Sequence, residues 1–263
     1  MKIVIIGAGN VATHLGCALK DVGHSILQVY SRTLQSAQGL GERLCVPYTN
    51  QVSAITSQAD FYIVSIKDFA LQEFIPELVK GREQALFVHT AGSMPMDVWK
   101  GHATHYGVLY PMQTFSKQRK VDFSSIPFFL EASDENHLQM LKQLAADLGS
   151  QSYCVNSEQR KKIHLAAVFA CNFSNHMYAL SAQILEKEGL PFSVMESLVA
   201  ETASKVHELS PVEAQTGPAV RYDTNVMDKQ LSLLADEPEM QEIYQKVSDS
   251  IHRLATKQDK MKL

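Results

Sequence analysis

The first half of the chain alternates short apolar runs with stretches of helical periodicity. The apolar runs are rich in β-branched and aromatic residues and are bounded by Gly, Asp or Pro, which predicts buried strands. We expect strands at 2–6, 26–30, 61–65, 86–89, 106–110, 126–131 and 152–155, and helices at 11–21, 33–43, 69–80, 94–100 and 134–148. This alternation predicts an α/β fold, with a doubly wound and mostly parallel sheet that helices cover on both faces.

After residue 156 the strand pattern stops and only helical patterns follow. A long helix is expected from Ser157 to about Lys187, where Gly189-Leu190-Pro191 ends it. Further helices are expected at 192–208, 223–234 and 239–257. We therefore predict two domains, an α/β domain over 1–154 and a C-terminal all-α domain over 155–263, which would bind substrate and mediate dimerisation.

A glycine-rich string, Gly7-Ala8-Gly9-Asn10-Val11-Ala12, follows the first strand directly and opens the first helix. In such a turn Gly7 permits the tight bend, Gly9 lets the backbone approach a pyrophosphate, and Ala12 allows close packing of helix on strand. The helix N-terminus adds free N–H groups and a partial positive charge. The string predicts a Rossmann-type dinucleotide-binding domain, with cofactor contacts from Gly7, Ala8, Gly9, Asn10 and Val11.

The residues after the second strand distinguish two dinucleotides. An NAD site places an acidic side chain there to bind the ribose 2′-hydroxyl, whereas this chain has Ser31-Arg32-Thr33. Two hydroxyl groups and a guanidinium suit a 2′-phosphate, which a carboxylate would repel. We therefore expect NADP (NADPH) rather than NAD, bound by Ser31, Arg32 and Thr33.

Two further loops follow strands at the same edge of the predicted sheet, where ligands of such folds bind. Ser65-Ile66-Lys67-Asp68 follows the third predicted strand and His89-Thr90-Ala91-Gly92 follows the fourth. Asp68 is better explained as a helix N-cap than as a ligand. The segment Tyr110–Thr114 ends the next strand and is expected to cover the cleft. The cofactor-binding residues predicted in these loops are Ser65, Ile66, Lys67, Thr90, Ala91 and Gly92.

Five strings, at 7–12, 89–93, 110–116, 164–173 and 215–223, carry a family resemblance. Over nearly its full length the chain resembles a family of Rossmann-like proteins labelled NADP oxidoreductases, which have a C-terminal helical domain of unknown function. More distantly it is similar to the β-hydroxyacid dehydrogenases and pyrroline-carboxylate reductases, in which a Rossmann domain precedes a helical domain, often in a dimer. The resemblance implies hydride transfer without naming a substrate.

One feature of the β-hydroxyacid dehydrogenases is missing. Those enzymes use a Lys followed by an Asn one helical turn later, but Lys161 and Lys162 are followed four residues on by Leu165 and Ala166. Their catalytic pair is therefore not carried over. This departure favours the alternative to an enzyme, a non-catalytic dinucleotide-binding sensor or partner protein.

A polar stripe on the long predicted helix supports the enzyme. At 100° per residue, Lys161, His164, Val168, Asn172 and Asn175 fall on one side of a helix that is otherwise mostly apolar. We expect such a helix to be buried, so the stripe would meet a ligand or, alternatively, form a hydrogen-bond network between helices.

The candidate chemistry is hydride transfer to or from a small polar carbonyl or imine substrate, in one version carboxylated. His164 would handle the proton, because an imidazole titrates near neutral pH, and Asn172 would orient the substrate. Thr216 and Arg221 bring a hydroxyl and a guanidinium to a Gly-Pro bend, as carboxylate binding requires. The bend could equally just separate two helices.

The composition of the chain argues against some classes of partner and favours one cellular compartment. The formal net charge is −4, and Arg160-Lys161-Lys162 is interpreted as a solvated helix end, so neither nucleic acid nor a membrane is an expected partner. Four widely spaced cysteines predict reduced thiols in a cytoplasmic protein. The ten histidines are scattered without an HExxH string or a similar cluster, so we expect no structural or catalytic metal. The apolar flanks of the helical domain predict a homodimer through the C-terminal helices.

Overall fold

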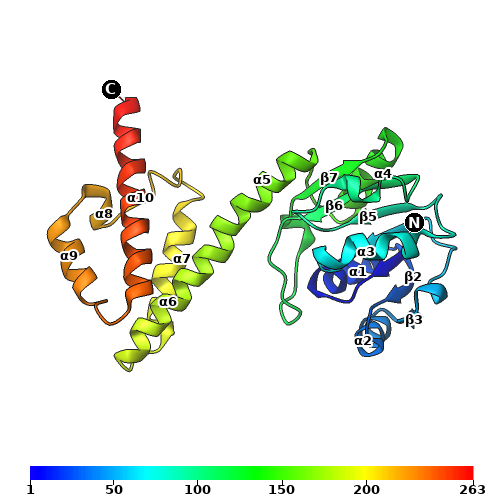
Figure 1. Ribbon diagram of the computed structural model, residues 1–263, viewed down its shortest axis with the longest axis horizontal. Coiled ribbons are helices and arrows are strands. Elements are labelled where there is room, and N and C mark those ends of the chain that lie inside the picture. The colour runs from blue at the N-terminus through cyan, green and yellow to red at the C-terminus, as the bar shows by residue number, and fades with distance from the viewer. Residues whose placement is uncertain (263) are drawn as a thin grey trace. The chain divides into compact units, whose positions relative to one another are not determined.

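The computed structural model describes residues 1–262, with side chains for residues 1–257. Two compact units make up the chain, Met1–Asn172 and Phe173–Leu263. Within the described residues, the strands belong to the first unit, and the second is built from helices (Figure 1). The last strand ends at Cys154, next to the predicted boundary, whereas the two units divide inside the long helical segment that follows.

The first unit contains one sheet with the order β3-β2-β1-β4-β5-β6-β7-β8. All neighbouring strands are parallel except β6 and β7, which confirms the predicted Rossmann-type, mostly parallel sheet. The strands are β1 (Lys2–Ile6), β2 (Ser25–Tyr30), β3 (Tyr48–Thr49), β4 (Phe61–Val64), β5 (Leu86–His89), β6 (His105–Pro111), β7 (Phe128–Ala132) and β8 (Ser152–Cys154).

Helices cover both faces of this sheet, and alternate residues of each strand point to opposite faces. On β1, Ile3 and Ile5 belong to one core with α1 (Asn10–Asp21), α2 (Leu34–Leu44) and α4 (Glu135–Asp147), whereas Val4 and Ile6 belong to the other with α3 (Asp68–Val79). The second core includes the single tryptophan, Trp99, which is fully buried, stacks on His89 and meets Phe87 with its ring tilted. Continuous apolar strands correctly predicted burial on both faces.

The chain after β8 forms a long helical segment. It begins as α5 (Ser157–Ala167), continues as a π-helix (Val168–Phe173) and ends as α6 (Ser174–Lys187). Asn156 caps α5 through a capping box with Gln159, which explains where the helix starts. Hydrogen bonds in a π-helix run from i to i+5, so this turn is wider than the α-helical turn that the sequence predicted.

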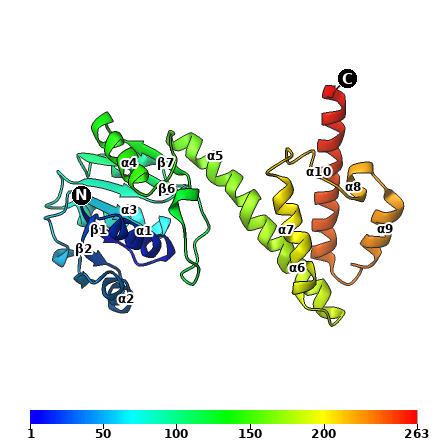
Figure 2. The same cartoon turned by 180° about the vertical axis from the view of Figure 1, so that it is seen from behind.

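The second unit contains five more helical elements, η5 (Phe192–Met195), α7 (Glu196–Lys205), α8 (Pro218–Arg221), α9 (Thr224–Ser232) and α10 (Pro238–Lys262). Helices α8 and α9 pack on α10 (Figure 2). The one-turn helix α8 was predicted only as a bend, because Gly217-Pro218 resembles a turn, although Pro at the first position of a helix is favourable. None of the described helices is both long and apolar enough for a membrane span.

Candidate active site

The glycine-rich turn after β1 has the shape that a dinucleotide needs. Gly7 has φ of 111°, and a Cβ atom there would lie 2.2 Å from the Ser65 carbonyl oxygen, so only glycine fits. Gly9 precedes α1, and a Cβ atom on it would meet nothing within 4 Å. Ala12 is fully buried against the sheet. The turn therefore leaves open backbone at a helix N-terminus, which fits a pyrophosphate.

A segment after β6 lies against the same helix. The Asn10 side-chain amide donates to the Phe115 carbonyl oxygen at 2.6 Å, and His14 Nε2 lies 2.9 Å from the Ser116 carbonyl oxygen. The His14 and Phe115 rings also stack, with centroids 5.8 Å apart. The amide of Asn10, a predicted cofactor ligand, is thus used in part to hold the chain that follows Tyr110–Thr114.

The loop after β2 carries an arginine, Arg32, whose guanidinium has no protein partner among the described residues. Arg32 and Thr33 are exposed and Ser31 is half-buried. In the part of the chain that the structure describes, the Arg32 guanidinium forms neither an ion pair nor a hydrogen bond, whereas the Thr33 hydroxyl donates to Ser36. Arg32 is therefore available to a ligand at the end of β2.

The loops after β4 and β5 are joined by a hydrogen bond, from the Thr90 hydroxyl to the Ser65 hydroxyl at 3.0 Å. Ile66 and Ala91 are half-buried beside them, and Lys67 is exposed. Lys67, and not Asp68, is the N-cap residue of α3. The Asp68 carboxylate instead accepts a hydrogen bond from the Ser93 hydroxyl, which ties the two loops together a second time.

Gly92, Tyr110 and His164 converge beside these loops. The Tyr110 hydroxyl, at the end of β6, lies 3.1 Å from Nδ1 of His164 on α5. A Cβ atom on Gly92 would lie 2.8 Å from both His164 Nδ1 and Tyr110 Cζ, so the backbone of Gly92 packs directly on the pair. Burial raises the pKa of Tyr110, and the positive charge of Arg160 partly opposes this effect. The tyrosine therefore carries its proton at neutral pH.

A buried ion pair fixes α5, and with it His164. Arg160 is completely buried and binds the Glu131 carboxylate on β7 and the Met94 carbonyl oxygen. Ser157 also donates to Glu131, at 2.9 Å. The interpretation of Arg160 as part of a solvated helix end is wrong, because this guanidinium is completely buried and paired with Glu131.

His89, at the end of β5, is structural. Its Nδ1 accepts from the Ala91 N–H at 3.2 Å, and its Nε2 lies 3.4 Å from the Pro95 carbonyl oxygen. Burial, together with the charge of Arg160, lowers the pKa of His89 to about 3. The neutral ring therefore holds the Thr90–Gly92 loop in place without titrating near pH 7.

The remaining predicted catalytic residues are all exposed. Asn172 lies in the π-helix, whose wider turn changes the 100° spacing on which the predicted stripe depended. Leu165 and Phe169 are 56% and 63% exposed, so the expectation that this helix is buried is wrong for the single chain. Thr216 and Arg221 belong to the second unit, and their roles stay predictions.

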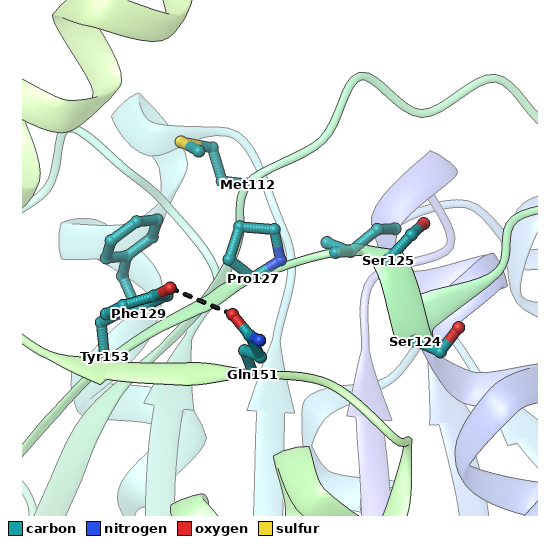
Figure 3. A pocket seen from close by; sticks show the side chains of 8 residues that line it. Met112, Ser124, Ser125, Pro127, Phe129, Gln151 and Tyr153 are labelled. Carbon is teal, nitrogen blue, oxygen red and sulfur yellow. Dashed lines mark hydrogen bonds between the residues drawn. The ribbon is translucent and has the colours of Figure 1, made fainter. Parts of the chain in front are cut away.

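A hollow of about 470 Å³ lies one strand away from Tyr110. Figure 3 shows its floor on β7 and β8, where Phe129 and Tyr153 stack and the Tyr153 hydroxyl donates to Gln151. The Tyr110 and Phe129 rings are 6.2 Å apart, so the aromatic row reaches from the Tyr110–His164 pair to this hollow. The lining residues are Met112, Ser124, Ser125, Ile126, Pro127, Phe129, Gln151 and Tyr153.

Sequence reasoning missed the role of three residues in this site. Tyr110 was predicted only as part of a segment that ends a strand and covers the cleft, Glu131 as the end of a strand, and Arg160 as part of a solvated helix end. One signal in the sequence could have pointed to Tyr110. It lies at the carboxyl end of a strand, and the neighbouring predicted strand is followed by the loop that contains Gly92. The Glu131–Arg160 pair spans 29 residues and has no local sequence pattern.

Comparisons with known proteins agree with this architecture. Residues 1–111 match a Rossmann-like domain model, and residues 126–251 match a domain of unknown function (DUF2520). A search of curated proteins finds no match. A crystal structure of a "putative NADP oxidoreductase" from Bacteroides fragilis is 56% identical, with a TM-score of 0.92, covering 96% of this chain and 98% of that one.

Two more distant structures share the fold. A protein from Thermotoga maritima is 21% identical with a TM-score of 0.80, covering 97% of this chain and 99% of that one. A 1-pyrroline-5-carboxylate reductase from Streptococcus pyogenes is 17% identical with a TM-score of 0.65, covering 96% and 98% of the two chains. These likenesses extend over both units of the chain.

Proposed function

Since the chain belongs to the family of the Bacteroides fragilis protein, which joins a Rossmann-like domain to a DUF2520 domain, we propose that it is an NADP-dependent oxidoreductase. It transfers a hydride to or from a small polar carbonyl or imine substrate. The observation that carries this proposal is the convergence of Gly92, Tyr110 and His164 at the carboxyl edge of the sheet.

In this proposal, different residues of the first unit bind different parts of the dinucleotide. The bound cofactor supplies or accepts the hydride. The turn from Gly7 to Val11 binds the pyrophosphate, and Ser31, Arg32 and Thr33 bind the 2′-phosphate. The loops Ser65–Lys67 and Thr90–Gly92 hold the nicotinamide end. Their mutual hydrogen bond, between Thr90 and Ser65, keeps this side of the site rigid.

Tyr110 and His164 move the proton that accompanies the hydride. When His164 carries a proton on Nδ1, it donates to the Tyr110 oxygen and leaves the tyrosine O–H free to donate to a substrate carbonyl or imine. His164 is half-buried, so it can take up a proton from solvent and return it to Tyr110. This assignment extends the proton role predicted for His164 to a tyrosine that touches the substrate.

Asn172, on the same helical segment as His164, orients the substrate in this proposal. Carboxylate binding by Thr216 and Arg221, which belong to the second unit, stays a prediction from the sequence. A screen for NADPH oxidation with small keto acids and cyclic imino acids tests the activity. Binding of NADPH without turnover on any member of such a panel, in a protein that keeps the Tyr110–His164 pair, would favour a non-catalytic dinucleotide sensor.

Replacing Arg32 with Ala is expected to weaken NADPH binding about tenfold or more, because a charge-assisted bond to the 2′-phosphate is lost. The affinity for NADH should stay unchanged. Enhancement of the fluorescence of the reduced nicotinamide measures both affinities. The matched control is Arg43→Ala, which removes an exposed arginine from α2 and should change neither affinity. Equal losses for both dinucleotides in Arg32→Ala would contradict the assignment.

The second unit forms a homodimer with a second copy of the chain in this proposal. Leu198, Leu233 and Leu254 are exposed by 62%, 85% and 53%, an apolar surface that water solvates poorly. Light scattering on the full-length protein should give twice the mass of one chain at micromolar concentration. A monomeric mass under those conditions would disprove the dimer.

We place the protein in the cytoplasm. Its cysteines, Cys17, Cys45, Cys154 and Cys171, are all free thiols. Free thiols, two of them exposed, suit a reducing compartment better than an oxidising one.

A further inference from the structure

Three ligand-type side chains converge at the edge of the sheet opposite the cofactor loops. His105 is the first residue of β6, whereas Tyr110 lies near its carboxyl end. Asp134 and His137 lie at the start of α4, after β7. One donor atom from each of the three side chains lies within 4.8 Å of the others, and none of the three is fully exposed.

The spacing of these atoms suits a small divalent cation. His137 Nδ1 lies 2.7 Å from Asp134 Oδ2, and His105 Nδ1 lies 3.6 Å from the same oxygen. A tetrahedral ion with bonds of about 2 Å places neighbouring ligand atoms roughly 3.3 Å apart. The two observed distances, 2.7 and 3.6 Å, lie on either side of that value, so shifts of about 0.6 and 0.3 Å would bring these atoms to the spacing that an ion requires.

Protein contacts alone explain only part of the cluster. The Asp134 side chain caps α4 by accepting from the His137 N–H, and His137 Nδ1 also faces that carboxylate. Among the described residues His105 forms no hydrogen bond. Its Nδ1 lies at ion-pair distance from Asp134 Oδ2, and its ring stacks on the His137 ring with centroids 4.2 Å apart. Two imidazoles directed at one carboxylate oxygen are the arrangement that a metal would stabilise.

We propose that His105, Asp134 and His137 form a binding site for a divalent transition-metal ion of the zinc type. Two imidazole nitrogens and one carboxylate oxygen are ligands that Zn²⁺ and Co²⁺ accept, and water completes the coordination. The ion connects the start of β6 to the first turn of α4. The site lies at the other end of β6 from Tyr110, so it stabilises the first unit and takes no part in hydride transfer.

Titration of tag-free, metal-stripped, full-length protein with Co²⁺ tests the site, because tetrahedral Co²⁺ bound to nitrogen and oxygen has an intense visible spectrum. We expect one saturable equivalent, displaced by Zn²⁺. The midpoint of thermal unfolding should rise by roughly 5 °C at a hundredfold excess over Kd. The proposal does not depend on the proposed function, since neither measurement uses cofactor or substrate.

Matched variants separate this site from adventitious binding by other histidines. His105→Gln and His137→Gln should lose the spectrum and the thermal shift. Asp134→Asn should lose them too, while its amide still caps α4 and preserves the fold. The control is His102→Gln, which removes an exposed histidine three residues before His105 and should bind Co²⁺ normally. No saturable binding, or binding unchanged in His105→Gln and His137→Gln, would overturn the proposal.

Discussion

Replacing Tyr110 with Phe is expected to lower kcat about 1,000-fold, the usual contribution of a positioned general acid. Phe keeps the ring that packs on Gly92 and Phe129 but removes the hydroxyl that lies 3.1 Å from His164. The affinity for NADPH should be unchanged, since the hydroxyl does not contribute to the phosphate-binding turn. Fluorescence titration and steady-state kinetics together measure the two effects.

The pH profile distinguishes a proton donor from a structural tyrosine. Tyr110 must be protonated to donate, so kcat for reduction should fall as the pH rises through its pKa, which burial raises above the ordinary value of a tyrosine. Below that pKa the tyrosine keeps its proton and this loss is absent. In Tyr110→Phe the alkaline decline assigned to this group should disappear. A Tyr110→Phe enzyme with wild-type kcat and an unchanged alkaline decline would exclude the assignment.

A glycine substitution provides an independent check on the same pair. Gly92→Ala places a Cβ atom 2.8 Å from both His164 Nδ1 and Tyr110 Cζ, which must then separate. A displacement of this size can cost about a hundredfold in rate. Gly39→Ala is the matched control, because Gly39 lies on the exposed side of α2, where a Cβ atom would meet nothing within 4 Å. Gly39→Ala should leave the rate unchanged.

The second large effect is expected on stability. Glu131→Ala removes the carboxylate partner of a completely buried guanidinium, and breaking such a pair typically costs about 3–5 kcal/mol. The free energy of unfolding of the first unit should fall by that amount in urea. His164 lies one helical turn after Arg160, so turnover should fall as well, even under conditions where the variant is folded.

Two comparisons test this explanation. Glu158→Ala breaks the exposed pair with Lys161 on the same helix and should leave stability within experimental error. A Glu131→Leu, Arg160→Met double variant removes both charges and should recover much of the stability that Glu131→Ala loses. A loss below about 1 kcal/mol in Glu131→Ala would mean that the pair behaves like an exposed one.

The sequence predicted the sheet well, because buried parallel strands have a local signature. Strands β1 and β5 were predicted with their observed bounds, and β3 was missed because two residues contain no pattern. The long helix was predicted from Ser157 to Lys187, but its π-helical turn was not. A π-helix has no composition of its own, so a stripe drawn at 100° per residue could not allow for it.

The candidate site divides in the same way. The glycine-rich turn of Gly7 and Gly9 is a short string in the sequence, so it could be predicted directly. The Tyr110–His164 and Glu131–Arg160 contacts join residues 54 and 29 positions apart, so only the fold brings them together. The His105–Asp134–His137 cluster likewise joins His105 to residues that are distant from it in sequence, so no metal-binding string predicts it.

The position of the single tryptophan determines what a spectroscopist would see. Trp99 is fully buried in the first unit, stacked on His89 directly below the Thr90–Gly92 loop. Its emission therefore reports on the unfolding of the first unit and does not report on the second unit, Phe173–Leu263. A denaturation curve followed by tryptophan emission describes one half of this molecule, and far-ultraviolet circular dichroism is needed to follow the helical half.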